Sequence, residues 1–233
     1  MKVLQALPFA LFAIIAHIPA SAQTVVLDEG TFRLRVGGQD VGNETFLIRQ
    51  NGTGENAVVI ATGKVVLDTA RSGQVLSVEL QMAGPALRIA AYQVNLTGTQ
   101  KEQIAGRVVG SRFSAKIISA EGEMMREYLA SDGAVVADEG VAHHYYFLAQ
   151  RVGAESARVP IIVPRRSQQV MAQVSSRGNE SVTVGGASLP ARRLVIAAPS
   201  EPERHVWVDA RGRVLRVEIP TRNYVAERVS APK

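Results

Sequence analysis

Histidines are the side chains of this chain best suited to bind metal or transfer protons, and His143 and His144 stand next to each other. The sequence contains no cysteine, and His205 lies far from the pair. Structural and catalytic metal sites gather several histidine, cysteine or carboxylate ligands around one ion. Adjacent side chains point in different directions on a helix or a strand, so the pair cannot hold one ion without distortion. We therefore expect no metal site.

Nucleophilic and acid–base motifs are also sparse. Ser111 lies outside any Gly-x-Ser-x-Gly elbow, and the Gly-rich corners lack the pattern of a phosphate-binding loop. Glu121 with Glu123, and Asp138 with Glu139, fit turns and helix starts better than a catalytic carboxylate pair. We expect no catalytic residue and no cofactor. An enzyme would need a cleft in which two acid–base groups converge, the candidates being Glu79, Asp138, Glu218 and His144.

An aromatic cluster, Tyr145 to Phe147, follows the two histidines in a chain with only 5% aromatic residues. Base-stacking platforms interleave aromatic and basic residues along a groove. This cluster lies on an otherwise apolar stripe, so no nucleic-acid partner is expected. It either packs in the core or lines an apolar ligand cavity. The candidate ligand-binding residues are Tyr92, Tyr145, Leu148 and Trp207.

Strands must position these residues, because apolar and polar side chains alternate along most of the chain. The clearest run has Leu76, Val78, Leu80 and Met82 on one face and Ser77, Glu79 and Gln81 on the other. This period of two is that of a half-buried strand, typically in an antiparallel sheet. The alternation predicts a mainly β protein.

Turn chemistry marks three hairpin corners, at residues 37–38, 185–186 and 209–212. Trp207 precedes the last corner and is expected to pack inward, against a strand whose Leu215, Val217 and Ile219 share one face. A change of phase between Ile89 and Tyr92 predicts a β-bulge near residues 90–91, which would curve the sheet.

One helix is predicted over residues 138–152, where Val141, Tyr145, Leu148 and Val152 form a single apolar stripe. Asp138 and Glu139 suit its start, and Gly153 its end. The apolar run 159–163 contains Pro160, which lacks the donor that a central strand needs. We expect that run at a sheet edge or in an extended connector.

The N-terminal residues 1–22 resemble an export signal. Lys2 is followed by an apolar run and by the small residues Ala20, Ser21 and Ala22. The apolar run is shorter than the roughly 20 residues of a spanning helix, so no membrane-spanning segment is expected in the mature chain. Residues 23–233 then form a single β-rich domain. A cysteine-free exported chain fits a bacterial periplasm better than a eukaryotic extracellular space, although an extracellular location stays open.

The chain carries a formal charge of +5, and its arginines are interleaved with apolar residues at strand spacing, as in residues 32–36. This pattern favours a solvated sheet face over a surface that binds polyanions.

Four features together carry a family resemblance: the export signal at residues 1–22, residues 30–38 (Gly-Thr-Phe-Arg-Leu-Arg-Val-Gly-Gly), His144-Tyr145-Tyr146, and residues 207–216. The chain resembles exported bacterial proteins of a domain-of-unknown-function family, built as a large curved antiparallel sheet. Such proteins are similar in outline to periplasmic lipoprotein-carrier half-barrels, whose concave apolar face holds acyl chains. The resemblance supplies no catalytic residue. Because the alternating strands have one apolar face that another element or a ligand must cover, we expect a strongly curved antiparallel sheet or half-barrel with the 138–152 helix packed across its concave side.

Two functions remain open from the sequence. The first is a non-enzymatic periplasmic protein that binds a hydrophobic or lipid ligand, such as an acyl chain, on its concave face. The second is a structural or interaction protein that docks an envelope protein through a sheet edge, with the run 159–163 as the place to look. A cavity fully filled by side chains such as Tyr145 and Leu148 would favour the second.

Overall fold

The computed structural model describes residues 24–68, 73–153 and 155–233, so the expected export signal at 1–22 lies outside the described residues. The first half of the described chain is a run of strands: β1 (Thr24–Val36), β2 (Gln39–Asn51), β3 (Val58–Leu67), β4 (Val75–Ala83), β5 (Arg88–Thr97), β6 (Glu102–Val109), β7 (Arg112–Ser119) and β8 (Gly122–Leu129). A short 3-10 helix, η1 (Gly54–Asn56), connects β2 to β3.

The second half begins with a short strand and the helical segment and then returns to strands. Its elements are β9 (Val135–Val136), η2 (Ala142–His144), α1 (Tyr145–Ala149), β10 (Ala157–Val163), η3 (Pro164–Arg166), β11 (Gln168–Val184), β12 (Ala187–Ala197), β13 (Arg204–Val208), β14 (Val214–Ile219), η4 (Pro220–Arg222) and β15 (Tyr224–Arg228). No helix in these described ranges is long and apolar enough to cross a membrane.

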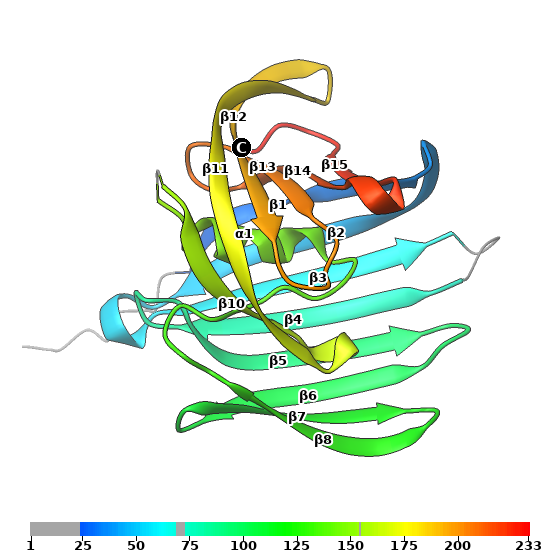
Figure 1. Ribbon diagram of the computed structural model, residues 1–233, viewed down its shortest axis with the longest axis vertical. Coiled ribbons are helices and arrows are strands. Elements are labelled where there is room, and N and C mark those ends of the chain that lie inside the picture. Colours follow the sequence, from blue (N-terminus) through cyan, green and yellow to red (C-terminus); the bar gives the residue numbers. More distant parts are fainter. Residues whose placement is uncertain (1–23, 69–72, 154) are drawn as a thin grey trace, which may run out of the picture.

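All the strands belong to one 15-stranded sheet, in the order β8-β7-β6-β5-β4-β3-β2-β1-β15-β14-β13-β12-β11-β10-β9. Neighbouring strands are antiparallel except β9 and β10, which are parallel. Figure 1 shows this sheet curling around α1. The expected curved, mainly antiparallel sheet with one helix in its concavity is confirmed.

The sheet does not close, because β8 and β9 are its two ends. A side chain narrows the gap at one point: the Gln169 amide donates to the Leu129 carbonyl at 2.8 Å and accepts from the Leu129 N–H at 3.0 Å. This contact joins the end of β8 to the start of β11. The side-chain amide of Gln169 bonds both backbone groups of Leu129, as the backbone of a neighbouring strand would.

The apolar and polar residues that alternate in the sequence lie on opposite faces of the sheet. Leu76, Val78, Leu80 and Met82 are buried in the main core, whereas Ser77 is exposed and Glu79 and Gln81 are half-buried. Burial of such side chains contributes roughly 1.5–3 kcal/mol each. The main core therefore fills the concave side of the sheet.

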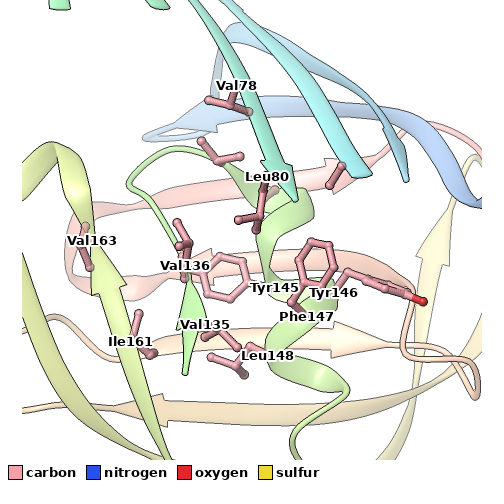
Figure 2. Packing of buried hydrophobic residues seen from close by; sticks show 14 of the residues in the cluster. Val78, Leu80, Val135, Val136, Tyr145, Tyr146, Phe147, Leu148, Ile161 and Val163 are labelled. Atoms are coloured by element: carbon pink, nitrogen blue, oxygen red, sulfur yellow. The ribbon is translucent and has the colours of Figure 1, made fainter. Parts of the chain in front are cut away.

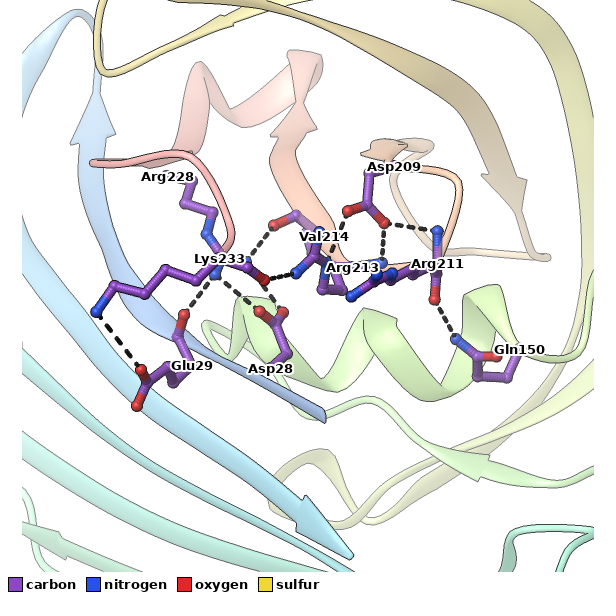
Figure 3. Close-up of polar contacts among 9 residues, drawn as sticks. All are labelled: Asp28, Glu29, Gln150, Asp209, Arg211, Arg213, Val214, Arg228 and Lys233. Atoms are coloured by element: carbon purple, nitrogen blue, oxygen red, sulfur yellow. Dashed lines mark hydrogen bonds and ion pairs between the residues drawn. The ribbon is translucent and has the colours of Figure 1, made fainter. Parts of the chain in front are cut away.

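The three predicted corners are confirmed. Gly37 and Gly38 form a two-residue hairpin with positive φ at both positions, which glycine adopts without strain. Gly185 and Gly186 repeat it between β11 and β12. At the third corner, the Asp209 carboxylate accepts the backbone N–H groups of residues 211 and 213, both at 2.9 Å (Figure 3).

The predicted bulge is also confirmed. Gln81 pairs with Ala91 and Met82 with Ile89, which leaves Ala90 as the extra residue. A second irregularity, between β13 and β14, corrects an expectation. Trp207 pairs with Arg216 and Val208 with Val214, so the bulge at Leu215 removes that residue from the face of Val217.

The helix prediction over 138–152 is too long. The α-helix covers only Tyr145–Ala149, and the 3-10 helix η2 precedes it. Asp138 cannot start a helix, because Gly140 has φ +76° and Val141 is extended. The start is instead supported by Glu44 of β2, whose carboxylate accepts the N–H groups of Ala142 at 2.7 Å and His143 at 3.0 Å.

The segment expected at an edge, 159–163, lies in β10, next to the end of the sheet. Ile161 and Ile162 pair with the two residues of β9, which cover that part of its outer side. Pro160 lies before the covered part, opposite Met171 of β11. The expected edge position therefore holds only around Pro160, because Ile161 and Ile162 are paired on both sides; the two ends of the sheet are β8 and β9.

Candidate functional site

An apolar cavity of about 380 Å³ opens where one end of β1 to β5 meets the loop before η2. It lies at the small end of the range of ligand pockets, roughly 300–1,000 Å³. Its lining is mostly aliphatic, and the polar side chains in it are Gln74, Glu139, Arg165 and Tyr224. The full lining is Leu34, Val36, Val41, Val65, Leu67, Gln74, Leu76, Leu96, Glu139, Gly140, Arg165 and Tyr224. The alternation of β1 to β5 places these aliphatic side chains on the concave face.

Arg165 and Tyr224 reach the cavity from two corners of the same design. Each corner is a strand followed by a 3-10 helix that begins with proline and ends at a left-handed residue, Ser167 in one and Asn223 in the other. Proline suits the first helical position because its missing N–H would be unpaired there. The two corners hold the loop at Glu139 between them.

Charged side chains meet where Arg165 lines the cavity. The Arg165 Nε donates to Glu102 Oε2 at 3.2 Å, and its Nη1 donates to the backbone carbonyl of Glu139 at 3.2 Å. Arg222 pairs with the Glu139 carboxylate. The cavity therefore combines an aliphatic interior with one positioned guanidinium.

The Tyr224 hydroxyl is buried and has no hydrogen-bond partner among the described residues. Burial raises the pKa of this phenol, so it stays protonated and can donate a hydrogen bond. Buried polar groups are normally paired, and an orphan indicates an absent ligand, an ordered water or strain. The hydroxyl oxygen itself is shielded from solvent and lies within the influence of Glu44 and Tyr145, so this orphan belongs to the core beside the cavity.

A second polar cluster lies in the core, beneath the helical segment. Besides the two backbone N–H groups, the Glu44 carboxylate contacts His143 Nδ1 at 2.5 Å. The His143 ring stacks on Phe46 with centroids 5.6 Å apart and lies directly over Gly63, where a side chain would collide with it. Glu44 and Gly63 thus position one histidine.

The other histidine is held by Asp138 and Tyr92. The Asp138 backbone N–H donates to His144 Nδ1 at 3.2 Å, and the Tyr92 hydroxyl donates to the Asp138 carboxylate at 2.8 Å. Burial raises the pKa of Asp138 to about 7, against the opposing charge of Arg165. Burial and the nearby His143 lower the pKa of His144, so its ring is neutral.

Two of the four acid–base candidates, Asp138 and His144, therefore do come together, but both are at most 1% exposed. Neither residue lines the apolar cavity. A substrate cannot reach them without opening the core, so this cluster positions the helical segment. Metal-ligating side chains form no group of three or more in the described ranges.

The four residues predicted to contact a ligand lie outside the cavity lining. Tyr92, Tyr145 and Leu148 are buried in the main core, where Tyr145 and Leu148 pack among residues of β9 and β10 (Figure 2). Trp207 is buried in a separate small cluster on the opposite face of β13, and its indole N–H donates to Glu180 at 2.6 Å. Inward packing of Trp207 into the main core is thus corrected. Ligand contact by all four stays a prediction.

Sequence reasoning missed Arg165 and Tyr224. The available signal was the repeated pattern of an aliphatic residue, proline, two polar residues and Ser or Asn, at residues 163–167 and 219–223. That pattern reveals two similar corners. It does not reveal that they meet at one cavity, because their approach depends on the curl of the whole sheet.

Larger hollows lie on the other face of the sheet, across β3 to β8. They measure about 560 and 730 Å³ and share Gln93, Ala105 and Lys116. These shared residues are exposed, and the hollows are open depressions over a solvated sheet face. Neither has the enclosed aliphatic lining expected of a hydrophobic-ligand site.

A buried ion pair ties the C-terminal strand to the first strand. Arg228 is only 2% exposed, and its guanidinium donates to the Asp28 carboxylate at 2.7 and 3.0 Å and also to the backbone carbonyls of Glu29 and Val214 (Figure 3). It also lies over the Phe46 ring, 5.3 Å from the centroid. Its partners are all within the fold, so the pair is structural.

Comparison with known proteins identifies the fold. The chain superposes on the crystal structure of a β-barrel-like protein of the domain of unknown function DUF1849 from Brucella abortus, with a TM-score of 0.59 and 8% sequence identity. The match covers 90% of this chain and 98% of that one. The likeness is one of fold. It confirms the expected resemblance to a domain-of-unknown-function protein with a large curved sheet.

A DUF1089 family protein from Pseudomonas aeruginosa is also similar, with a TM-score of 0.39 and 11% identity over 89% of this chain and 95% of that one. No family model matches the sequence, and no curated protein matches it.

Proposed function

We propose that this protein is a non-enzymatic binding protein for a hydrophobic ligand, such as an acyl chain, which occupies the cavity at the end of β1 to β5. The observation that carries the proposal is the aliphatic cavity of about 380 Å³ at the end of β1 to β5. Its setting would be the periplasm, to which the sequence of residues 1–22 points.

The cavity differs in place from the sequence-based expectation. Helix α1 fills the centre of the concave face, and Tyr145 and Leu148 are packed in it. The unfilled volume remains beyond the helical segment, where Gly140 contributes backbone without a side chain. The proposed ligand therefore occupies the end of the half-barrel.

Binding can be measured by displacement of the uncharged fluorescent probe N-phenyl-1-naphthylamine with myristate. The Val65→Phe variant places a ring in the cavity, whereas Val109→Phe makes the same change at a position that is 62% exposed and far along the sheet. We expect Val65→Phe to weaken myristate binding by about tenfold or more, through lost apolar burial. Val109→Phe should bind as the unmodified protein does.

Both variants are compared by circular dichroism and thermal unfolding, so that loss of binding is separated from loss of fold. Absence of saturable binding by the unmodified protein would refute the proposal. So would binding that Val65→Phe leaves unchanged while the variant remains folded.

A second candidate function, docking of an envelope protein, is favoured by the other end of the sheet. Strand β8 has a strand neighbour only on its β7 side, and Met125 and Leu129 on it are 59% and 53% exposed. Open edges recruit other chains through unpaired backbone groups. Cross-linking in envelope extracts from a photoreactive residue at Met125, with one at Val25 as control, tests this; no reproducible Met125-specific product would count against it.

A further inference from the structure

We infer that the ligand carries an anionic head group, a carboxylate or a phosphate monoester, which the guanidinium of Arg165 binds at the cavity. This inference rests on the proposed function and names the chemical class of its ligand: a single-chain anionic amphiphile. The carrying observation is a positioned guanidinium in the wall of an otherwise aliphatic cavity.

The Arg165 side chain is fixed before any ligand arrives. Glu102 Oε2 holds its Nε and the Glu139 carbonyl holds its Nη1, both at 3.2 Å. A guanidinium has five N–H donors in a planar fork, so two bonds leave donors for a further acceptor. Because the fork is already oriented, little conformational entropy is lost when a carboxylate or phosphate binds it.

Partial burial strengthens this contact. The Arg165 side chain is 21% exposed and that of its partner Glu102 is 18% exposed. Charges in such positions are screened by water and salt less than surface charges are. An anion at this guanidinium is therefore held more firmly than at an exposed arginine.

The local charge balance favours an anion over a cation. Among the cavity-lining residues, only Arg165 and Glu139 are charged at neutral pH, and the Glu139 carboxylate is paired with Arg222 outside the lining. The remaining competitors for Arg165 are Glu102, which pairs with it, and Asp138, whose pKa the Arg165 charge lowers; neither is part of the lining. An incoming anion thus shares Arg165 with Glu102 as its direct ion-pair partner, and removal of the Glu102 charge should strengthen anion binding.

The test compares ligands that differ only in the head group: myristate, tetradecyl phosphate and 1-tetradecanol, with inorganic phosphate as a free anion. Each displaces N-phenyl-1-naphthylamine from the unmodified protein and from Arg165→Gln, Glu102→Gln and Arg166→Gln. Arg166 is the matched control, because it is the next residue of the same corner and pairs with Glu201 at 2.7 Å, outside the cavity lining.

We expect Arg165→Gln to weaken binding of the acid and of the alkyl phosphate by about tenfold or more, the loss of a charge-assisted hydrogen bond. Binding of the alcohol should change by less than about twofold, and Arg166→Gln should leave all three unchanged. Glu102→Gln should raise affinity for the two anions and not for the alcohol. A folding defect cannot produce that last result.

If all three ligands bind and Arg165→Gln weakens them equally, or weakens none, the head-group inference is wrong while the proposed function stands. If inorganic phosphate binds as well as tetradecyl phosphate, the site is an anion site and the amphiphile class is refuted. If no tetradecyl ligand binds the unmodified protein, the proposed function itself has failed.

Discussion

Replacement of Gly63 by alanine should expel the His143 ring from its place in the core. A methyl group on Gly63 would lie 2.9 Å from His143 Nδ1 and closer still to Cε1. The ring cannot retreat freely, because its Nδ1 contacts Glu44 at 2.5 Å and its face stacks on Phe46. Gly63 is not in the left-handed region, so the backbone itself accepts alanine.

Two contributions set the size of the effect. Overpacking of a well-filled core costs about 1–3 kcal/mol. If the hydrogen bond between His143 and the Glu44 carboxylate is lost as well, this adds about 1.5–3 kcal/mol to the cost of overpacking. We therefore expect Gly63→Ala to lower the free energy of unfolding by about 3–5 kcal/mol, measured by urea denaturation.

A double-mutant cycle tests the reasoning. In the His143→Ala background the collision is gone, so Gly63→Ala should change stability by less than about 1 kcal/mol. Gly153→Ala is the control substitution, because a methyl group there meets no atom within 4 Å. An equal destabilisation by Gly63→Ala in both backgrounds would refute the assigned collision.

Three further predictions concern Trp207, Asp138 and Arg228. Trp207→Ala should lower the free energy of unfolding by about 3–5 kcal/mol, as large aromatic deletions do; an unchanged melting temperature with lost ligand binding would make Trp207 a contact residue. Burial raises the pKa of Asp138 from 3.8 to about 7, so its stabilising contribution is complete below about pH 4 and is lost as the pH rises through about 7. Asp138→Asn should remove this slope, at most about 1.4 kcal/mol per pH unit, from stability curves between about pH 4 and 8; identical slopes would contradict the shift. Arg228→Met should cost about 3–5 kcal/mol by leaving the Asp28 carboxylate buried and unpaired, and Asp28→Asn in the same chain should recover part of it on urea titration; equal stability of the single and double variants would count against this.

Much of the sheet could be predicted from the sequence, because its signals are local. The alternation in β4, the paired glycines of two hairpins and the bulge at Ala90 depend on residues a few positions apart. The fold similarity to the β-barrel-like DUF1849 protein agrees with the prediction of a large curved sheet.

The helix boundary and the cavity could not be predicted, because both depend on residues far apart in the chain. The carboxylate that supports the start of η2 comes from Glu44, 98 positions before Ala142. Arg165 and Tyr224 meet at the cavity only after β1 to β5 and β15 have paired across the curled sheet. The face that Trp207 occupies could not be predicted either, because alternation with a period of two does not say which of two buried faces of a sheet belongs to the main core.

The central claim, that the end cavity holds a hydrophobic ligand, is tested most directly by native mass spectrometry of the protein purified without detergent from the periplasm of an expressing bacterium. We predict a bound species whose mass matches a single-chain amphiphile, recovered on organic extraction and strongly reduced in folded Val65→Phe. Consistently ligand-free protein that also fails to take up added myristate, or a bound species retained equally by Val65→Phe, would contradict it.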